Sequence, residues 1–551
     1  MTIQERYQNW IDSAYITEND RIQLLKMTKT SDIQECFGQE LQFGTGGMRG
    51  ELGLGPNRMN RYMIGKAVQA ALMANQIENP LVIIAYDTRR MSQSFAEEAA
   101  RVALGNGARV ALFDAERPVP ELSFAVRRKK AALGIMITAS HNPPEYNGIK
   151  LYGSDGAQMV PKVIQPIIEA FKRITSLEMI QRDPIEFLHD HPSFDFLGEE
   201  LDEAYVSYCL TQKKRKEVDC SIHVVYTPLH GAGNRLVRRV LSRRGFHNVW
   251  TVTSQERPDP DFSTVNTPNP EESEALRLAV ECAMEREADL VIATDPDCDR
   301  VGVVVMDEGQ AIALNGNQIG VLLLNYLINQ TKEFSPGATI VKTIVTSDLG
   351  VKIAERNGLK WQETLTGFKY IGEKMDQYAN DPERSFFFGY EESYGYLTGD
   401  QVRDKDGVLV AMLIVEMASF YRCHGVSLNR HLQEIYHDFG HYKESLDSFV
   451  SKGIAGQEKI QAVMEAFRTQ SPFTDKQTGV RDYLSPDTGL PAENVIKVYF
   501  DQAWIALRPS GTEPKLKCYY SAWSDSEAES EAILNDLQKD MREFIQKVFD
   551  K

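Results

Sequence analysis

Short apolar segments typical of buried β-strands alternate along this chain with amphipathic segments typical of helices. Apolar runs predict strands at 81–85, in the segment that runs through Met136, at 289–294 and at 385–388. Apolar residues at helical spacing predict helices at 94–104, 163–171 and 272–286. Because strands and helices alternate, the sequence predicts the α/β class, with mostly parallel or mixed sheets.

Each predicted strand runs directly into an unusual polar loop. These loops are 86–90 (YDTRR), 138–143 (TASHNP), 295–300 (DPDCDR) and 389–395 (GYEESYG). In open α/β sheets ligands bind at the carboxyl ends of the strands. We therefore expect the chemistry of the protein in these loops.

The length of 551 residues suggests about three to four domains. We predict domain boundaries at 1–200, 201–313, 314–432 and 433–551. The residues 5–26 look like a helical extension ahead of the first unit. Strands at 495–500, 504–507 and 516–520, followed by a charged terminal helix, indicate that the last unit is an α+β module.

Composition narrows the possible partners and the compartment. The formal net charge of −17 argues against a nucleic-acid or anionic-membrane partner, so any anionic substrate must meet a local cluster of positive charge. The amino-terminal segment lacks the apolar core of a secretory signal, and the longest apolar run, 408–415, is far shorter than the roughly 20 residues that span a bilayer. Seven scattered cysteines without a C-x-x-C pair predict reduced thiols in a cytoplasmic protein, with neither a zinc site nor a disulfide framework.

Ser140 and His141 stand where the strand through Met136 ends. The following Pro143 and Pro144 stop regular structure, because proline lacks an amide donor and constrains the residue before it. Two interpretations fit this segment alone: a reactive serine presented at a strand end, or a simple turn terminated by proline.

Three aspartates follow the strand at 289–294 in alternate positions. In an extended conformation Asp295, Asp297 and Asp299 would point the same way and repel one another without a cation. The loop is not an EF-hand, because Arg300 stands where that loop needs glycine. Three carboxylates with room for a phosphate oxygen and water suit one Mg²⁺ ion, although a solvated acidic turn has the same sequence pattern.

Two other segments combine glycine with cations and so resemble phosphate-binding loops. Residues 43–50 (FGTGGMRG) contain four glycines and Arg49, and residues 508–515 (RPSGTEPK) contain two cations and two hydroxyls. Glycine permits close approach of the backbone, and arginine can hold phosphate with two hydrogen bonds. Neither segment is a Walker A motif, and a plain β-turn is an alternative for the second.

Together these motifs resemble the α-D-phosphohexomutase family, which comprises phosphoglucomutases and phosphomannomutases and is related to phosphopentomutases. Four segments match in order across nearly the whole chain: 138–143, 295–300, 389–393 (GYEES) and 508–512 (RPSGT). The resemblance implies a four-domain α/β architecture, with three related α/β domains and a C-terminal α+β domain around a central cleft.

The resemblance also implies a role for each matching residue. Ser140 would be the phosphoserine and would complete the Mg²⁺ shell with Asp295, Asp297 and Asp299. The catalytic set around the reacting phosphate would further contain Arg49, His141, Lys150 and Lys405, with His141, Lys150 and Lys405 as candidate bases. Substrate would be bound by Arg300, Gly367, Lys369, Glu391, Ser393, Arg508, Ser510, Gly511 and Thr512.

The function implied is that of a phosphoglucomutase, which interconverts glucose 1-phosphate and glucose 6-phosphate through a phosphoserine and a glucose 1,6-bisphosphate intermediate that also serves as activator. The expected partners are small sugar phosphates, and the protein would be a monomer or a homodimer without nucleic-acid or membrane partners. The alternatives are a phosphomannomutase or phosphopentomutase, a metal-dependent sugar phosphatase that releases phosphate to water, and a sugar-phosphate sensor without catalysis.

Overall fold

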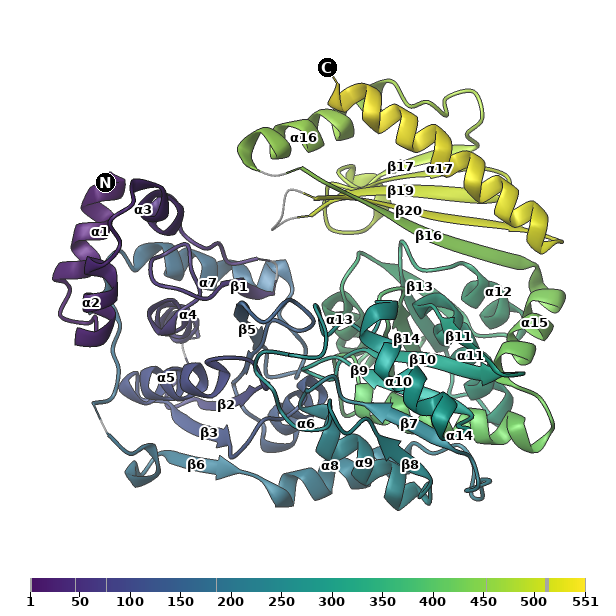
Figure 1. Cartoon of the computed structure of the whole chain (residues 1–551), viewed down its shortest axis with the longest axis horizontal. Coiled ribbons are helices and arrows are strands. Elements are labelled where there is room, and N and C mark those ends of the chain that lie inside the picture. The colour runs from purple at the N-terminus through teal and green to yellow at the C-terminus, as the bar shows by residue number, and fades with distance from the viewer. Residues whose placement is uncertain are drawn as a thin grey trace.

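Four β-sheets follow one another along the chain in the computed structural model of the protein (Figure 1). The structure describes residues 2–44, 46–75, 77–184, 186–451, 453–510 and 515–550, without the side chains of 453–455. Helices and strands alternate through the first three sheets, as the sequence predicts. The protein therefore has the predicted α/β fold.

The first sheet has six strands in the order β1-β5-β4-β2-β3-β6. The strands are β1 (Gly47–Glu51), β2 (Leu81–Tyr86), β3 (Arg109–Phe113), β4 (Leu133–Ile137), β5 (Tyr146–Tyr152) and β6 (Phe194–Leu197). Its helices are α4 (Arg61–Ala74), α5 (Ser92–Gly105), α6 (Val119–Lys129) and α7 (Pro161–Arg173). The helical extension predicted at 5–26 consists of α1 (Ile3–Asp12) and α2 (Glu18–Leu25). The helix α1 packs against both α2 and α3 (Thr30–Phe37).

The second sheet has the order β11-β10-β9-β7-β8 and follows the linking helix α8 (Glu199–Thr211). Its strands are β7 (Val224–Thr227), β8 (Val249–Thr251), β9 (Leu290–Thr294), β10 (Val301–Asp307) and β11 (Gln310–Leu314), and its helices are α9 (Gly233–Arg244) and α10 (Ser273–Glu285).

The third sheet has the order β13-β12-β14-β15. Its strands are β12 (Ala338–Thr343), β13 (Lys360–Thr364), β14 (Ser385–Glu391) and β15 (Gly395–Thr398). Its helices are α11 (Gly316–Gln330), α12 (Leu349–Arg356), α13 (Phe368–Tyr378), α14 (Gly407–Cys423) and α15 (Leu428–Phe439). The almost fully buried α14 packs against α9 of the second unit and so joins the two units in one apolar core.

These three units share one topology that short sequence matches do not reveal. In each, a strand that pairs in parallel on one side runs into a loop and returns as an antiparallel neighbour: β4 to β5, β9 to β10 and β14 to β15. The corresponding stretches of strand order are β5-β4-β2-β3, β10-β9-β7-β8 and β15-β14-β12-β13. The loops that contain 138–143, 295–300 and 392–394 therefore occupy equivalent positions in three related α/β units, and the loop predicted at 389–395 is shorter than expected because β14 extends to Glu391.

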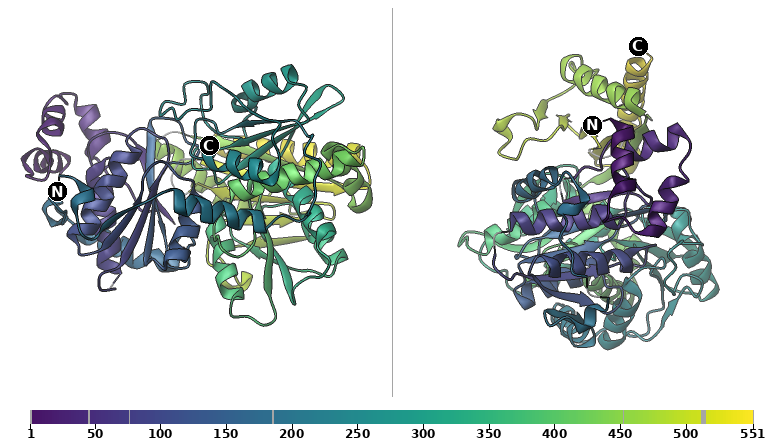
Figure 2. Two further views of the ribbon diagram at one scale, coloured as in Figure 1. Left: turned by 90° about the horizontal axis from the view of Figure 1, so that it is seen from below. Right: turned by 90° about the vertical axis from the view of Figure 1, so that its left-hand side faces the viewer.

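The fourth sheet is antiparallel throughout, with the order β16-β20-β19-β18-β17. Its strands are β16 (His441–Val450), β17 (Gly479–Asp482), β18 (Ile496–Tyr499), β19 (Ala503–Pro509) and β20 (Lys515–Ser524), and its helices are α16 (Gly453–Thr469) and α17 (Glu527–Phe549). The two helices pack on one face (Figure 2). Trp504 and Tyr519 on the other face pack against Ile344 and Tyr370 of the third unit. This is the α+β module that the sequence predicts.

We propose domain boundaries at 1–200, 201–313, 314–432 and 433–551, although residues 200 and 432 lie inside α8 and α15, which connect neighbouring sheets. Among the described residues, no single helix is long and apolar enough to cross a membrane. Only α14 and α15 taken together have sufficient length and apolar composition, and these two helices are bent by 84° relative to one another.

Candidate active site

The loops of the three α/β units come together and place Ser140 against the acidic loop. Ser140 Oγ donates a hydrogen bond to Asp295 Oδ2 at 2.8 Å. Lys150 Nζ, on β5 of the first unit, lies 2.8 Å from Asp297 Oδ2 and 3.2 Å from Asp299 Oδ2. Lys405 Nζ, which follows β15 of the third unit, lies 3.1 Å from the same Asp299 oxygen. Residues from three sheets thus form one buried cluster.

Ser140 is buried and has a left-handed backbone with φ of +53°. Its amide donates to Thr138 Oγ1 at 2.8 Å, and His141 Nδ1 lies 3.3 Å from its Oγ. A left-handed non-glycine residue costs roughly 1–2 kcal/mol and persists only where its surroundings hold it. The segment is therefore a specifically held loop and more than a turn terminated by proline.

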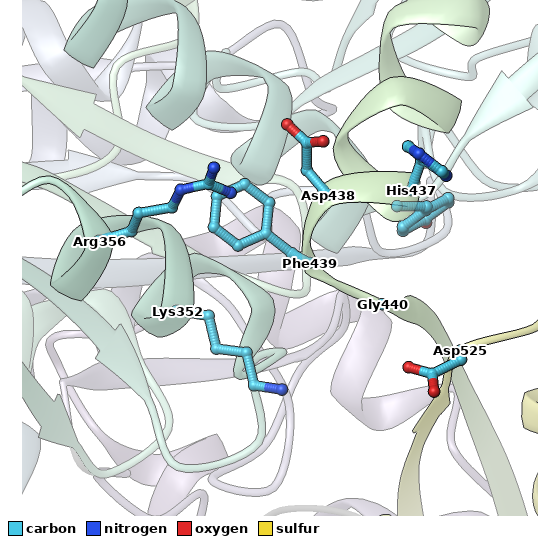
Figure 3. Close-up of a pocket in the computed structure, with 8 residues that line it drawn as sticks. Lys352, Arg356, His437, Asp438, Phe439, Gly440 and Asp525 are labelled. Carbon is cyan, nitrogen blue, oxygen red and sulfur yellow. The ribbon is translucent and has the colours of Figure 1, made fainter.

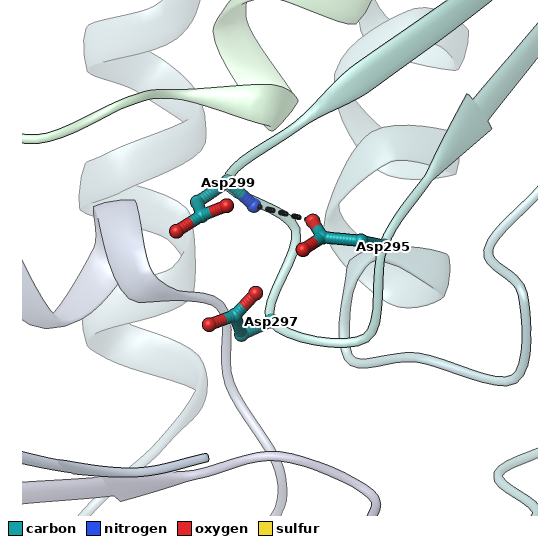
Figure 4. Close-up of side chains that lie close together, drawn as sticks. All are labelled: Asp295, Asp297 and Asp299. Atoms are coloured by element: carbon teal, nitrogen blue, oxygen red, sulfur yellow. Dashed lines mark hydrogen bonds between the residues drawn. The ribbon is translucent and has the colours of Figure 1, made fainter. Parts of the chain in front are cut away.

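The three aspartates point toward one another (Figure 4), although not for the reason that their alternation suggests. The expectation of an extended loop is wrong: Cys298 N donates to Asp295 O at 2.9 Å, and Cys298 is left-handed with φ of +51°. This turn curls the chain and brings one oxygen of each carboxylate within 4.8 Å of the others. Asp295 Oδ1 accepts the amides of Asp299 and Arg300 at 3.1 and 3.0 Å.

The acidic cluster, Asp295, Asp297 and Asp299, fits a divalent cation. All three side chains are buried, and Asp297 Oδ1 and Asp299 Oδ1 have no hydrogen-bond partner among the described residues. Burial, together with the neighbouring charges of Asp297 and Asp299, raises the pKa of Asp295 well above its ordinary value. Unpartnered buried carboxylate oxygens are costly unless they bind a cation, and oxygen ligands are those that Mg²⁺ prefers.

Several cations surround this cluster. Burial opposes charge on Asp299, but the ammonium groups of Lys405 and Lys150 outweigh it and lower the pKa of that carboxyl. Burial, with the guanidinium groups of Arg300 and Arg49, lowers the pKa of His141 well below its ordinary value. Local positive charge thus gathers here despite the acidic composition of the chain.

Arg49 lies on a strand and not in an open glycine-rich loop as the motif suggests. Residues 47–51 form β1, which pairs with β5 so that Gly47 faces Lys150. A Cβ atom on Gly47 would lie 2.1 Å from the carbonyl oxygen of Ile149, so glycine permits this close pairing. Arg49 Nη1 donates to Asn142 Oδ1 at 2.9 Å and therefore reaches the Ser140 loop.

The predicted sugar-binding residues line the adjoining part of the third unit. Glu391 is buried at the end of β14, and burial raises its pKa to about 7, a shift that the nearby Lys405 opposes. Ser393 is half-buried in the loop that follows. Gly367, with φ of +115°, precedes α13, and burial lowers the pKa of Lys369 in its first turn to about 8.

The fourth unit contributes Arg508 and Ser510 from the end of β19. Arg508 Nε donates to Glu493 Oε1 at 2.8 Å, and the Ser510 amide donates to the carbonyl of Lys515 at 2.7 Å. Gly511 and Thr512, predicted in the same loop, lie outside the described residues.

Sequence reasoning missed several groups beside the site. Glu271 forms an ion pair with Arg300, and the nearby Glu392 accepts hydrogen bonds from Thr343 and Thr346 at 3.1 and 3.3 Å. Glu392 and Glu271 also act electrostatically on Lys517 of β20, whose pKa is lowered by burial. No local pattern marks Glu271 or Lys517, because their position depends on how the units pack.

A surface pocket of about 620 Å³ lies elsewhere, where α12 and α15 meet the start of β16 (Figure 3). Lys352, Arg356, His437 and Asp525 are among the residues that line it. None of the predicted site residues that the structure describes lines this pocket.

Family models match all four units. They are phosphoglucomutase/phosphomannomutase alpha/beta/alpha domain I at 40–178, domain II at 203–309 and domain III at 315–439, and the C-terminal domain at 453–543.

Similar proteins have related names. A phosphoglucomutase of Staphylococcus haemolyticus (strain JCSC1435) is 39% identical over 527 residues, covering 92% of this chain and 95% of that protein. A phosphoglucomutase of Staphylococcus aureus (strain COL) is 38% identical over 542 residues, covering 93% and 94%.

Solved structures agree on the fold. A putative phosphomannomutase from Thermus thermophilus has a TM-score of 0.69 at 24% identity, covering 92% of this chain and 99% of that chain. Parafusin, a phosphoglucomutase from Paramecium, has a TM-score of 0.71 at 17% identity, covering 93% and 97%. The chain belongs to the phosphoglucomutase/phosphomannomutase family.

Proposed function

We propose that this protein interconverts glucose 1-phosphate and glucose 6-phosphate by phosphoryl transfer through Ser140. The hydrogen bond from Ser140 Oγ to Asp295 Oδ2, inside the buried acidic cluster, carries this proposal. The similarity to proteins named phosphoglucomutase, at 37–39% identity over most of the chain, supports glucose as the sugar.

One Mg²⁺ ion is proposed at the acidic cluster, held by Asp295, Asp297 and Asp299 together with Ser140 in its phosphorylated form. When bound, the ion would neutralise charge that develops on the transferring phosphoryl group. The two partnerless carboxylate oxygens support this assignment.

In the first half of the proposed reaction the phosphorus–oxygen bond at Ser140 breaks while a sugar hydroxyl oxygen forms a new bond to phosphorus. The hydroxyl proton passes to a protein base, for which His141, Lys150 and Lys405 are the candidates. Lys150 and Lys405, which contact the aspartates, also place positive charge beside the phosphoryl group. Arg49 and Arg300 are proposed to add two further positive charges around the phosphoryl group.

In the second half, the resulting glucose 1,6-bisphosphate presents its other phosphate to Ser140. The sugar must therefore bind in two orientations, with Glu391 and Ser393 accepting or donating hydrogen bonds to its hydroxyls. The phosphate that is not being transferred is proposed to be held by Arg508, Ser510, Gly511 and Thr512. Gly367 and Lys369 are proposed to help distinguish the two orientations of the sugar. Burial lowers the pKa of Lys369, and both Glu493 and its ion-pair partner Arg508 act on Lys369, so these two segments lie close together.

A coupled assay tests this proposal. Purified protein, Mg²⁺, glucose 1-phosphate and a trace of glucose 1,6-bisphosphate are supplied, and glucose 6-phosphate is followed with a dehydrogenase. Mannose 1-phosphate and ribose 1-phosphate run in parallel, and free phosphate is measured in every arm. Turnover of glucose 1-phosphate that a chelator abolishes is the expected result.

The other outcomes have distinct meanings. Preferential turnover of mannose or ribose phosphate would move the proposal to a phosphomannomutase or phosphopentomutase. Stoichiometric release of free phosphate would indicate a metal-dependent sugar phosphatase. No activity with any of the three substrates would favour a sugar-phosphate sensor without catalysis.

We propose a cytoplasmic location from the scattered cysteines, and a monomer or homodimer that acts on small sugar phosphates.

A further inference from the structure

The polar turn after β2 contains a buried ion pair that the proposed reaction does not use. Asp87 and Arg89 are 2% and 3% exposed, and Arg89 Nε lies 3.3 Å from Asp87 Oδ2. A buried guanidinium is costly unless nearby charges and acceptors compensate for its lost hydration. Nε of Arg89 makes no hydrogen bond among the described residues, so the two Nη atoms form all of the hydrogen bonds of this guanidinium. Its partners therefore indicate what the pair is for.

The guanidinium of Arg89 donates to four backbone carbonyls of the segment that carries Ser140. Nη2 donates to Ser140 O at 2.5 Å and to the carbonyl of Asn142. Nη1 donates to Pro143 O at 2.8 Å and Tyr146 O at 3.2 Å. Three of these carbonyls lie in the loop between β4 and β5, and the fourth belongs to Tyr146, the first residue of β5. One side chain thus ties the Ser140 loop to the start of the following strand.

Asp87 holds the same loop from its other end. Its Oδ2 accepts from Thr138 Oγ1 at 2.6 Å, and Thr138 Oγ1 in turn accepts the Ser140 amide at 2.8 Å. Its Oδ1 accepts from Arg89 N at 3.0 Å and from Ser92 Oγ at 2.6 Å. The left-handed Ser140 is therefore held on both its amide and its carbonyl side by one ion pair.

The outer side of Arg89 contacts the second unit. Its guanidinium carbon lies 4.9 Å from the centroid of the fully buried Phe262 ring, and the adjacent Arg90 pairs with Asp261. Phe262 lies between β8 and α10, in the segment that also supplies Glu271, the partner of Arg300. Arg89 thus packs between the Ser140 loop and the unit that carries the acidic cluster.

We infer that Arg89 is a positioning residue, which fixes the left-handed Ser140 loop and aligns Oγ with the acidic cluster. Lysine cannot replace it, because an ammonium group is a single point with three donors and cannot span four carbonyls in the plane of a guanidinium. A misplacement of about 1 Å can cost on the order of 100-fold in rate. This inference rests on the proposed role of Ser140, but its structural part can be tested without turnover.

The test compares Arg89→Lys with Arg90→Lys, whose side chain is exposed and pairs only with Asp261 among the described residues. We expect Arg89→Lys to lower kcat by about 100-fold while KM for the sugar phosphate stays within about threefold. Arg90→Lys should stay near the wild type. A kcat for folded Arg89→Lys within about threefold of the wild type, or a loss of kcat that follows only the unfolded fraction, would overturn the inference.

Hydrogen exchange separates a failure of this inference from a failure of the proposed function. The peptide covering 138–146 should lose amide protection in Arg89→Lys, whereas the β9 peptide should keep it. Unchanged protection of 138–146 contradicts the inference even if the wild type has no mutase activity. Phe262→Leu provides a second variant if Arg89→Lys does not fold: we expect a smaller fall in kcat, about three- to tenfold, with KM unchanged, and no fall would count against the inference.

Discussion

Two buried groups of charges in this molecule differ in a way that separates a reactive site from a structural ion pair. The first is the acidic cluster of Asp295, Asp297 and Asp299. The second, the interface cluster, consists of Lys342, Lys497, Asp348 and Glu363, where the third sheet meets the fourth. Both lie in apolar surroundings, so both must compensate for lost hydration.

The interface cluster contains two positive and two negative side chains, and its buried polar atoms have partners. Lys342 Nζ lies 2.8 Å from both Asp348 Oδ1 and Glu363 Oε1, Lys497 Nζ donates to Ile344 O at 2.7 Å, and Trp504 Nε1 donates to Asp348 Oδ2 at 3.0 Å. None of its side-chain nitrogen or oxygen atoms is left both buried and without a partner in the described structure.

In the acidic cluster the negative charges outnumber the neighbouring ammonium groups, and some carboxylate oxygens lack hydrogen-bond partners in the part of the chain that the structure describes. Three carboxylates stand against the two ammonium groups of Lys150 and Lys405, which contact Asp297 and Asp299. Two of the carboxylate oxygens have no hydrogen-bond partner among the described residues. Both clusters lie in apolar surroundings, so burial alone does not distinguish them. Uncompensated charge and unsatisfied hydrogen-bonding atoms are what indicate a ligand-binding site.

The largest expected effect comes from removing the phosphoryl acceptor. Ser140→Ala should lower kcat at least about 10⁴-fold, because no other group can take its place as the nucleophile. The melting temperature should hardly change, since alanine removes only the oxygen that contacts Asp295. Turnover is measured in the coupled assay with the exposed Ser154→Ala as control. Turnover of Ser140→Ala close to that of the wild type would exclude the proposed mechanism.

Next in size is the effect of removing one charge from the acidic cluster. Asp297→Asn should lower kcat by about 10²–10³-fold, because a cation would lose a charged ligand. The free energy of unfolding should change by less than about 1 kcal/mol, because the lost contact with Lys150 is offset by weaker repulsion between carboxylates. Urea unfolding without metal measures this second quantity. A large loss of stability together with full activity would make the acidic cluster a structural one.

The opposite result is expected for the interface cluster. Lys342→Met leaves the half-buried Asp348 and Glu363 without their main cation, so the free energy of unfolding should fall by about 2–3 kcal/mol. The kcat of the folded fraction should stay within about threefold of the wild type. Urea unfolding and the coupled assay at low temperature measure the two quantities. A loss of kcat without a loss of stability would mean that this cluster takes part in the reaction.

The smallest effect is a pH dependence of stability. Burial, with the nearby ammonium of Lys342, lowers the pKa of Lys497 from 10.5 to about 8. Between these values the unfolded chain binds the proton that the folded protein has lost, so Lys497 makes folding more favourable as pH rises from about 8 to about 10.5.

We expect this contribution to be of the order of 1–3 kcal/mol. It is measured as the change in unfolding free energy between the two ends of that pH range, in wild type and in Lys497→Met. The exposed Lys539→Met serves as control. An identical pH dependence in wild type and Lys497→Met would show that Lys497 keeps its ordinary pKa.

The sequence predicts the site better than it predicts how the site is held. Apolar runs ending in polar loops located Ser140, Asp295 and Glu391, because a strand end is a local feature. The curled acidic loop could not be predicted from alternation, since a left-handed Cys298 reverses the chain. Arg89 was visible only as part of a polar loop, because its four acceptors lie 51 to 57 residues away.

The shared topology of the three α/β units was implied only by the family resemblance and could not be seen in the motifs themselves. Equivalent loops after β4, β9 and β14 have different sequences, and only the strand order shows their correspondence. The sequence analysis missed Lys517 and Glu271 for a related reason. Packing between units brings these residues to the site, and no pattern in the neighbouring sequence indicates that position.

The most direct test of the whole account is a measurement of where the phosphoryl group resides. The protein is incubated with glucose 1,6-bisphosphate and Mg²⁺, digested, and the peptides are sequenced by mass spectrometry. We expect one phosphoryl group on Ser140. When that group carries an isotopic label, the label should pass to the sugar phosphate after addition of glucose 1-phosphate, while the bisphosphate formed phosphorylates Ser140 again. Phosphorylation should be about 10²–10³-fold slower in Asp297→Asn and should not occur with a chelator. Phosphate on another residue, or phosphorylation of Ser140 at the wild-type rate in Asp297→Asn, would contradict the account.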